Sequence, residues 1–461
     1  MHDIDKDYHM LENTQRLKMP AHGWIGFVLL IVSEMLMLRG VEPFSSYFYS
    51  FAWWSYILLV DGIVYMRKGN SLLVNRRREF LTMVPWSVVF WLVIEAFNFQ
   101  LKNWYYANME TFLPARWTGY FIAYATVLPA LFETLELLES FDILSGVKGS
   151  RYRFSPTARW AMATMGTVML LITLIAPRYA FPLVWLGFVF LLDPIVYRFG
   201  GRSLLRKMEE EGPVKLYRLM IAGIICGFLW EFWNFWARIK WYYTVPFFDE
   251  IKLFEMHVMG FLGFAPFAVE CYVMYAFVCL FRDGRWWEHD STCPSISTQV
   301  RHVGRTLLAA ASMAVFFPAM FHALDNYTVD SYASRMGDFT AVSKEEERRI
   351  NALNVDRVED FDRWAKRIGA RGVSQALGIP EEKAHRLQEI AQLAAIKGMG
   401  TSNFRLLELA GVDTTAKLAR QEPDTLFHEL LLINKKHRIR QRPPRRAILK
   451  NWILAAKDLS G

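Results

Sequence analysis

Glutamates recur inside the most apolar stretches of this 461-residue sequence, each beside a side chain that could share its chemistry. In the stretch WLVIEAFNFQLKNWYY, Glu95 precedes Asn98 by three positions, and FLWEFWNFWARIKWYY repeats this spacing with Glu231 and Asn234. Residues three apart lie on one face of a helix, so each pair places a carboxyl group beside an amide. An acid inside a membrane helix is costly and marks a functional site by default. The spacing therefore predicts two equivalent Glu-Asn pairs that could take part in proton transfer or ligand binding.

Four further acids come in equivalent pairs. Glu133 and Glu270 each follow a proline by four positions, and Asp61 and Asp193 each open a similar stretch, DGIVYMRKGNSLL and DPIVYRFGGRSLL. The candidate catalytic residues are Glu95, Glu133, Glu231 and Glu270. The candidate ligand-binding residues are Asn98, Asn234, Trp230, Trp233, Trp241, Asp61 and Asp193. A structural role stays open for each acid, because it could bond to an indole or an arginine, or lie at a wetted helix end, as the basic loops beside Asp61 and Asp193 suggest.

The composition places these acids in a membrane protein. Hydrophobic residues make up 53% of the chain and aromatic residues 15%, which is unusual for a soluble domain. Stretches of about 20 apolar residues can span a bilayer. We expect an all-α fold with roughly nine such helices, at 23–40, 50–66, 80–98, 117–138, 157–177, 180–197, 217–236, 258–281 and 303–323.

The paired motifs predict an internal duplication. The Asp61 and Asp193 stretches match at an offset of 132 positions, and Glu-x-x-Asn-Phe followed by Trp-Tyr-Tyr also occurs twice. Four helices per copy make the repeats parallel, related by an axis along the membrane normal. We expect repeat one at 23–140, repeat two at 157–281 and an extra helix at 303–323, with the glutamates lining one enclosed cavity between the repeats. The two Trp-Tyr-Tyr triplets are interpreted as an aromatic belt at the outer interface, with a ligand cage as the alternative.

Charge predicts the orientation. The polar segment 1–22 contains no secretory signal pattern, and the loops at 67–79, 147–153 and 198–218 are rich in Lys and Arg. Basic loops stay in the cytoplasm, so we expect a multi-pass protein of a bacterial-type inner membrane with a cytoplasmic N-terminus. The side of the C-terminal part stays open. The four cysteines lack metal-site or disulfide spacing, and neither a metal nor another cofactor is expected.

The membrane part, over about residues 50–285, resembles the integral-membrane lycopene cyclases and carotenoid hydratases. The resemblance rests on Glu-x-x-Asn, Trp-x-Tyr and the stretch GFLGFAPFAVECYVMY, although Glu270 has no second acid beside it. It implies cofactor-free acid catalysis on an isoprenoid or carotenoid-like lipid, in which Glu231 or Glu270 donates a proton and aromatic faces stabilise a carbocation. Packing against lipid is the alternative role for these aromatic residues.

The chain after residue 325 has a different character. We expect a charged helical linker at 325–376 and a small domain at 377–461, which resembles a tandem helix-hairpin-helix family of unknown function. Gly398 and Gly400 would form its hairpin, where backbone amides can bind phosphate. The basic residues expected to contact phosphate or lipid headgroups are Lys435, Lys436, Arg438, Arg440, Arg442, Arg445 and Arg446. Beside a membrane this favours an anionic lipid or a protein partner over nucleic acid, and a solvated basic face remains open.

Two function classes follow from the sequence. The first is a membrane protein that binds or transforms an isoprenoid-like lipid between the repeats. The alternative is a non-catalytic scaffold or transporter whose C-terminal domain recruits a partner.

Overall fold

The structure is a computed structural model that describes residues 18–147, 152–244, 251–282, 286–288, 302–440 and 444–460. The chain divides into two compact units. The first unit contains residues 1–101, 117–237 and 245–323, and the second contains residues 102–116, 238–244 and 324–461. Each unit is described by itself below.

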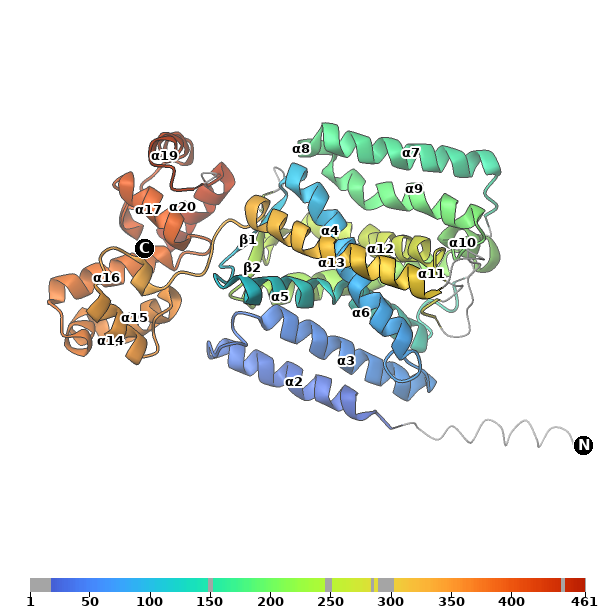
Figure 1. Cartoon of the computed structure of the whole chain (residues 1–461), viewed down its shortest axis with the longest axis horizontal. Coiled ribbons are helices and arrows are strands. Elements are labelled where there is room, and N and C mark those ends of the chain that lie inside the picture. Colours follow the sequence, from blue (N-terminus) through green and yellow to red (C-terminus); the bar gives the residue numbers. More distant parts are fainter. Residues whose placement is uncertain are drawn as a thin grey trace, which may run out of the picture. The chain divides into compact units, whose positions relative to one another are not determined.

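The first unit consists almost entirely of helices (Figure 1). Its helices are α2 (Ala21–Leu38), α3 (Phe48–Lys68), α4 (Arg77–Leu101), α5 (Leu113–Tyr124), α6 (Val127–Ser140), α7 (Pro156–Ile175), α8 (Pro177–Ala180), α9 (Val184–Arg198), α10 (Leu204–Glu211), α11 (Val214–Trp236), α12 (Phe264–Cys279) and α13 (His302–Tyr327), with the 3-10 turns η1 (Phe181–Leu183) and η2 (Val258–Gly263). A short hairpin joins strands β3 (Lys252–Leu253) and β4 (Met256–His257). The first residues of α5 and the last of α13 belong to the second unit.

Eight helical segments in the described part of the chain are long and apolar enough to cross a membrane. The ninth expected span, 50–66, lies within α3, which is not among the eight because Asp61 and several Trp, Tyr and Ser residues lower its hydropathy. The outermost helices expose apolar side chains, such as Trp24 and Ile25 on α2 at 57% exposure each. An apolar surface of this extent fits contact with lipid better than contact with water.

Helix pairs form two opposite edges of the first unit, α2 with α3 and α7 with α9, and the helices α4, α6, α11 and α12 lie between them (Figure 1). Glycine allows close approach within both pairs. A Cβ atom at Gly26 would lie 2.6 Å from Ser55 O, and one at Gly166 would lie 2.6 Å from Gly187 O. Both edge pairs are therefore held by backbone-to-backbone packing.

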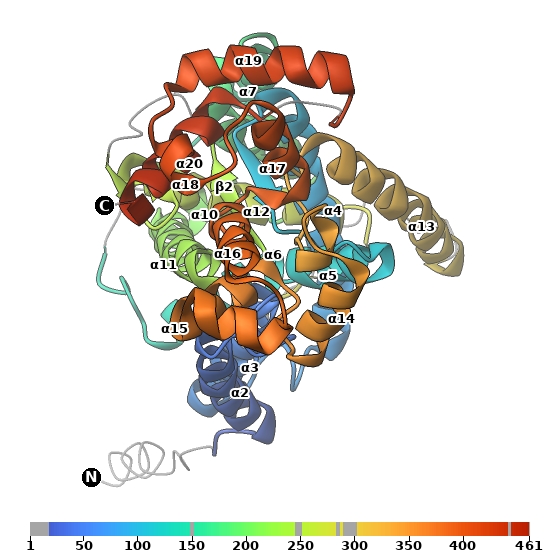
Figure 2. The ribbon, with the colours of Figure 1, turned by 90° about the vertical axis from the view of Figure 1, so that its left-hand side faces the viewer.

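The second unit combines a two-stranded sheet with the C-terminal helices (Figure 2). Its elements are β1 (Trp104–Ala107), β2 (Lys240–Tyr243), η3 (Met336–Asp338), α14 (Lys344–Ala352), α15 (Val358–Leu377), α16 (Glu381–Ala394), α17 (Gly400–Leu409), α18 (Thr415–Ala419), α19 (Pro423–His437) and α20 (Arg446–Ser460). The strands are antiparallel and pair Trp104 with Tyr243, Tyr105 with Tyr242, and Tyr106 with Trp241.

Both Trp-Tyr-Tyr triplets therefore form strands, which corrects their interpretation as an aromatic belt. Tyr105 and Tyr242 are 3% and 6% exposed and belong to one hydrophobic core with residues of α14 to α20. Their rings lie 5.5 Å apart between centroids. An interfacial belt needs rings that face lipid headgroups, whereas these rings are buried in protein.

The expected linker at 325–376 is also corrected. Phe339, Ile350 and Phe361 are almost fully buried in the same core, so this segment forms part of the folded domain. The many charged residues suggested a linker, but they lie on the exposed polar faces of α14 and α15, whose apolar faces pack inward. In the described part of 377–458 every regular element is a helix, and Gly398 and Gly400, both with positive φ, form the turn between α16 and α17.

Candidate functional site

The first Glu-Asn pair has the geometry that its spacing predicts. Glu95 is fully buried and accepts hydrogen bonds from Trp91 Nε1 at 3.0 Å and from Asn98 Nδ2 at 3.4 Å. The Trp91 ring lies 5.1 Å from that of Trp230, which directly precedes Glu231. The two motif copies thus approach one another through a pair of indoles, one from α4 and one from α11.

The predicted ligand-binding tryptophans lie in the interior of the first unit. The Trp53 ring lies 6.0 Å from Trp230 and 4.9 Å from Trp233, both nearly edge-on, and all three side chains are at most 6% exposed. Edge-to-face aromatic pairs stabilise a core beyond the area they bury. These tryptophans are therefore core residues next to the glutamates, and lipid-facing packing does not describe them. Trp241 lies elsewhere, on β2 in the second unit.

Glu133 and Glu270 have an unusual environment. Both residues are 0% exposed, and among the residues that the structure describes no N–H or O–H donor reaches their four carboxyl oxygens. Glu133 does lie near the carboxyl group of Asp61 and the charge of Arg76. A buried carboxylate without a partner is strongly unfavourable. Each group must therefore hold a proton, or meet a cation or a donor group from water or a bound molecule.

The glutamates of the first repeat do not converge. Ser87 Oγ on α4 accepts a hydrogen bond from Leu128 N on α6 at 3.0 Å, while Arg76 before α4 meets Glu136 near the end of α6. The two helices are thus antiparallel. At 1.5 Å per residue, Glu95 and Glu133 lie in opposite directions from that contact, about 20 Å apart along the axis.

The second copy shows the same separation. A Cβ atom at Gly223 on α11 would touch Phe264 and Ala268 on α12. Glu231 and Glu270 extend in opposite directions from this crossing and lie about 18 Å apart by the same rise per residue. The two acids of each repeat therefore do not lie side by side, and the prediction that Glu95, Asn98, Glu133, Glu231, Asn234 and Glu270 line one enclosed cavity stays a prediction. Helix direction, which the motifs alone do not reveal, separates the two acids of each repeat.

Asp61 and Asp193 hold the loops that follow their helices. Asp61 accepts bonds from Leu73 N at 2.8 Å and Ser71 Oγ at 2.9 Å, and contacts His22 Nε2 at 2.7 Å. Asp193 accepts bonds from Leu204 N and Leu205 N at 2.7 and 2.8 Å. With their oxygens engaged in this way, both aspartates fit the structural role that the sequence left open, rather than ligand binding.

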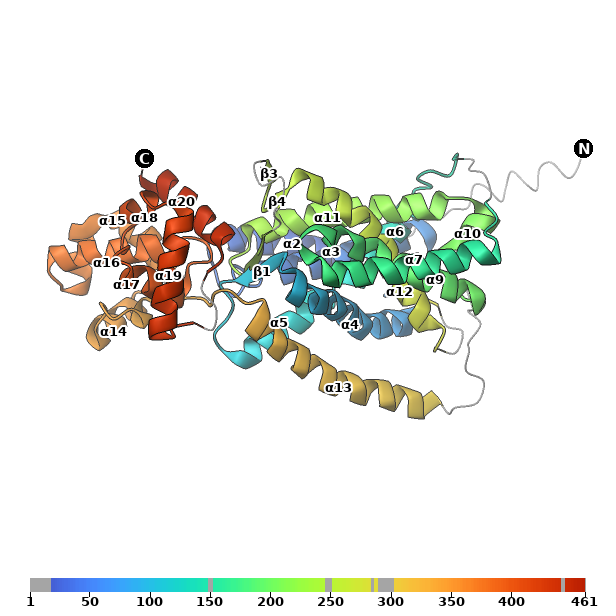
Figure 3. The ribbon, with the colours of Figure 1, turned by 90° about the horizontal axis from the view of Figure 1, so that it is seen from above.

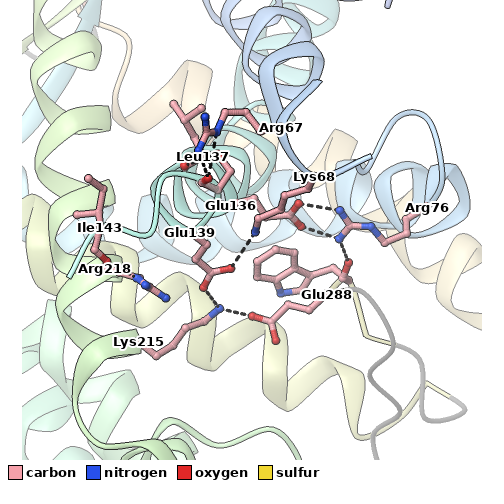
Figure 4. Close-up of polar contacts among 12 residues, drawn as sticks. Arg67, Lys68, Arg76, Glu136, Leu137, Glu139, Ile143, Lys215, Arg218 and Glu288 are labelled. Atoms are coloured by element: carbon pink, nitrogen blue, oxygen red, sulfur yellow. Dashed lines mark hydrogen bonds and ion pairs between the residues drawn. The ribbon is translucent and has the colours of Figure 1, made fainter. Parts of the chain in front are cut away.

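A largely buried ionic network joins helices of the first unit around Glu136 and Glu139, near the end of α6 (Figure 4). Arg76 forms a bidentate pair with Glu136 at 2.6 and 2.7 Å and donates to Trp287 O at 2.5 Å. Nearby, Lys215 at the start of α11 lies 2.7 Å from Glu139 and also pairs with Glu288. The network thus connects α6 to α11 and to residues 286–288.

One signal for this network was present in the sequence. Glu133, Glu136 and Glu139 follow one another at three-residue spacing, which places them along one helix face. Of the three, only Glu133 is a candidate site residue by its repeat-related position. Lys215 and Glu288 come from distant parts of the chain, so their approach could not be predicted from spacing.

A second ion pair joins the other two central helices. Arg282, which follows α12, pairs with Glu79 at the start of α4 at 2.7 Å and donates to Tyr275 Oη at 2.8 Å. The start of each long helix, α4 or α11, is thus tied by charge to the end of a helix from the other half.

The predicted phosphate site at the α16–α17 turn is not an open one. Gly398 is buried, and a Cβ atom there would lie within 3.8 Å of Ala107, Trp452 and Tyr242. Gly400 lines a pocket of about 350 Å³ whose wall includes both acids, Asp325, Asp330 and Asp338, and the arginines Arg440 and Arg445. The phosphate-binding role of the two glycines stays a prediction.

The basic residues of the C-terminal segment separate into two groups. The Arg440 side chain is 12% exposed and bonds to Asn403 and Asp330, and Arg445 donates to Lys102 O at 2.9 Å. Arg446 pairs with Asp424 at 2.9 Å. Lys435, Lys436 and Arg438 are exposed at the end of α19, whereas Arg442 lies outside the described residues. Among the described residues of this segment, Lys435, Lys436 and Arg438 present cations to solvent, and the half-exposed Arg446 shares its charge with Asp424.

Metal ligands do not cluster in the described chain: it contains no group of three or more His, Cys, Asp or Glu side chains arranged to hold an ion.

The fold is of the all-α class with two small two-stranded sheets, and its long apolar helices are compatible with a multi-pass membrane protein. Residues 340–459 match the family described as a domain of unknown function, DUF4332. Neither a curated protein nor a solved structure matches the chain. The comparisons support the C-terminal domain family and extend it to residue 340, but they give no support to the resemblance to lycopene cyclases or to helix-hairpin-helix domains.

Proposed function

We propose that the chain is a multi-pass membrane scaffold that holds a DUF4332 domain on one side of the bilayer and recruits a partner through it. The observation that supports this most is the composition of the second unit. Its core combines the C-terminal helices with β1 and β2, which follow α4 and α11 directly along the chain. A domain tethered only by a flexible linker would not need strands from two membrane loops.

The shared sheet also supports an assignment of sides. Residues 102–116, 238–244 and 324–461 belong to one compact unit, so all three must lie on the same side of the membrane. The basic loops at 67–79 and 198–218 come at the other ends of α4 and α11. Basic loops remain cytoplasmic. We propose that the second unit lies on the outer face of the inner membrane and that the N-terminus is cytoplasmic.

Cysteine labelling tests these sides. Lys344 on α14 has an 85% exposed side chain, Arg78 at the start of α4 is exposed, and Cys226, Cys271 and Cys279 are buried. In a Cys293→Ser background, we expect an impermeant maleimide to label Lys344→Cys only in right-side-out vesicles and Arg78→Cys only in inverted ones. Labelling of both from the same side refutes the assignment.

The symmetry of the contacts supports two parallel repeats. In the sheet, Trp104 pairs with Tyr243 and Tyr106 pairs with Trp241. A two-fold axis through the Tyr105–Tyr242 pair would produce this pairing, because it relates each triplet to the other. In the first unit, Asp61 accepts from Leu73 N, and Asp193 accepts from Leu205 N at the same spacing. We propose that these correspond to the repeats expected from the sequence.

The exposed end of α19 is the proposed recruiting surface. Leu432 is 70% exposed and lies beside Lys435 and Lys436, which suits a partner with an acidic, partly apolar surface. We expect a photo-crosslinker at position 432, but not one at Lys344, to capture one protein in membranes, and Lys435→Glu with Lys436→Glu to abolish that capture. Crosslinks to lipid alone would show that α19 binds the bilayer instead.

A second function, acid chemistry on an isoprenoid-like lipid, is favoured by Glu133 and Glu270. Two fully buried carboxyl groups without a hydrogen-bond donor in the described chain are suited to donating protons. Lipids extracted from the purified protein would then include a polyene whose conversion stops in the Glu270→Gln variant. If no such lipid is found, this candidate fails and the scaffold remains.

A further inference from the structure

A pocket of about 710 Å³ lies where α7 begins and α9 ends, beside α10. These three helices lie together at one edge of the first unit (Figures 1 and 3). Its wall includes Arg159, Arg198 and Arg206, together with the aromatic residues Trp160, Tyr197 and Phe199. None of the proposed functions uses this pocket.

Aromatic faces hold the three guanidinium groups. The Cζ atoms of Arg159 and Arg206 lie 4.1 and 4.6 Å from the ring centroid of Tyr197. Arg198 Cζ lies 5.2 Å from the ring of Trp160. Arg159 and Arg206 also donate one hydrogen bond each, to Phe154 O and Tyr197 O. Neither kind of contact neutralises the charge of a guanidinium group, so the remaining N–H groups keep their capacity to bind an anion.

The positive charge of the pocket is not balanced by acids. Within the described chain, no carboxylate lies within 4 Å of the nitrogens of Arg159, Arg198 or Arg206, and Arg206 Nε is buried without a hydrogen-bond partner. The nearby carboxylate of Glu209 accepts bonds from Phe154 N and Tyr197 Oη, each at 2.7 Å. Three cations therefore face one carboxylate that is already engaged.

Glu209 responds to this positive field. Desolvation alone would raise the pKa of Glu209, but the bonds from Phe154 and Tyr197 and the charges of Arg159 and Arg206 hold that pKa below its usual value. The surroundings thus favour negative charge at this point.

The rest of the pocket is apolar and opens where lipid is expected. Trp160 is 57% exposed and Phe199 is 46% exposed, and both come at the boundary between apolar helices and the Lys/Arg-rich loops at 147–153 and 198–218. Basic pockets between membrane helices on the cytoplasmic side are suited to lipid headgroups. Arginine forks match the oxygens of a phosphate group.

We propose that this pocket binds the phosphate headgroup of an anionic lipid of the leaflet that faces the basic loops. The guanidinium groups of Arg159, Arg198 and Arg206 contact the phosphate oxygens, and Trp160 and Phe199 lie along the acyl chains. The proposal does not depend on the scaffold function.

The test uses the purified, delipidated full-length chain in detergent, with bound lipid counted by native mass spectrometry. We expect phosphatidylglycerol to bind and phosphatidylcholine to bind far less. The double variant Arg159→Gln with Arg206→Gln should weaken phosphatidylglycerol binding by about tenfold or more. The reason is that it removes two of the three charges that attract the lipid phosphate. Arg153→Gln is the matched control, since Arg153 is exposed and does not line the pocket.

The single variant Arg198→Gln separates an effect on binding from an effect on folding, because Arg198 is exposed and its replacement leaves the packing of the helices intact. We expect this single variant to weaken binding while its melting temperature stays unchanged. Unaltered phosphatidylglycerol binding by both variants overturns the proposal. Inorganic phosphate that displaces the lipid at equal concentration would identify the site as one for free phosphate and would also overturn it.

Discussion

At the level of single residues, neighbouring glutamates on α6 have opposite environments. Glu136 forms a bidentate pair with Arg76, while Glu133, one turn earlier, has no hydrogen-bond partner in the described chain. We expect Glu136→Gln to destabilise the protein by about 3 kcal/mol, because it leaves Arg76 without its counter-charge. Glu133→Gln should be near neutral, since an amide replaces an acid that has no ion pair to lose.

Thermal unfolding of both variants in the same detergent measures this difference. Equal losses for the two variants would mean that Glu133 has an ionic partner that the described contacts do not include.

Glu288 makes the ionic network sensitive to acid. Although burial alone would raise the pKa of Glu288, the charge of Lys215 and the bonds from Lys215 and Trp286 hold that pKa below its usual value. A carboxyl group whose pKa is lower in the folded state stabilises the protein at pH values above the usual glutamate pKa of about 4.3. This contribution to the free energy of unfolding is lost as the pH falls below that value.

We therefore expect the melting temperature of the wild type to fall as the pH drops below about 4.3, the usual pKa of a glutamate. The Glu288→Gln variant should be less stable at neutral pH and should show a shallower decline on acidification. Parallel profiles for the two proteins would exclude Glu288 as a source of the acid sensitivity.

At the level of elements, close helix crossings depend on single glycines. A Cβ atom at Gly166 on α7 would lie 2.4 Å from Leu191 N on α9, whereas one at Gly146 would meet nothing within 4 Å. We expect Gly166→Ala to destabilise the first unit by about 1–3 kcal/mol, because backbone must move to admit the methyl group. Gly146→Ala is the matched control and should change the melting temperature little; a similar loss in both would point to glycine flexibility rather than the crossing.

The strands offer a test of the second unit. Tyr242 is 6% exposed and lies in the core shared by β1, β2 and the C-terminal helices. Tyr242→Ala should cost about 3–5 kcal/mol, as for other large aromatic residues in a core, and limited proteolysis should then cleave within 340–459 sooner. Ile251→Ala is the control, because Ile251 is 72% exposed; unchanged proteolysis of Tyr242→Ala would show that the strands do not support the domain.

Sequence reasoning succeeded where the signal was local. Hydropathy located the helices, and the three-residue spacing placed Glu95 beside Asn98. It failed where distant segments meet. The Trp-Tyr-Tyr triplets looked interfacial because aromatic residues near a helix end usually are, and nothing in their local pattern indicated that two loops would pair as strands. The α6 network likewise depends on Lys215 and Glu288, which no spacing rule relates to Glu139.

At the level of the whole molecule, chain order has a consequence for synthesis. β1 ends at Ala107, β2 begins at Lys240, and the domain that completes their core runs to the last helix. Both strands are therefore synthesised long before the C-terminal helices that bury them. Their tyrosines stay unburied while the remaining helices insert. Closure of the second unit thus requires that the chain has been translated and inserted as far as α20, and a chain that stops before residue 340 would leave the tyrosines of both strands without most of the core that covers them.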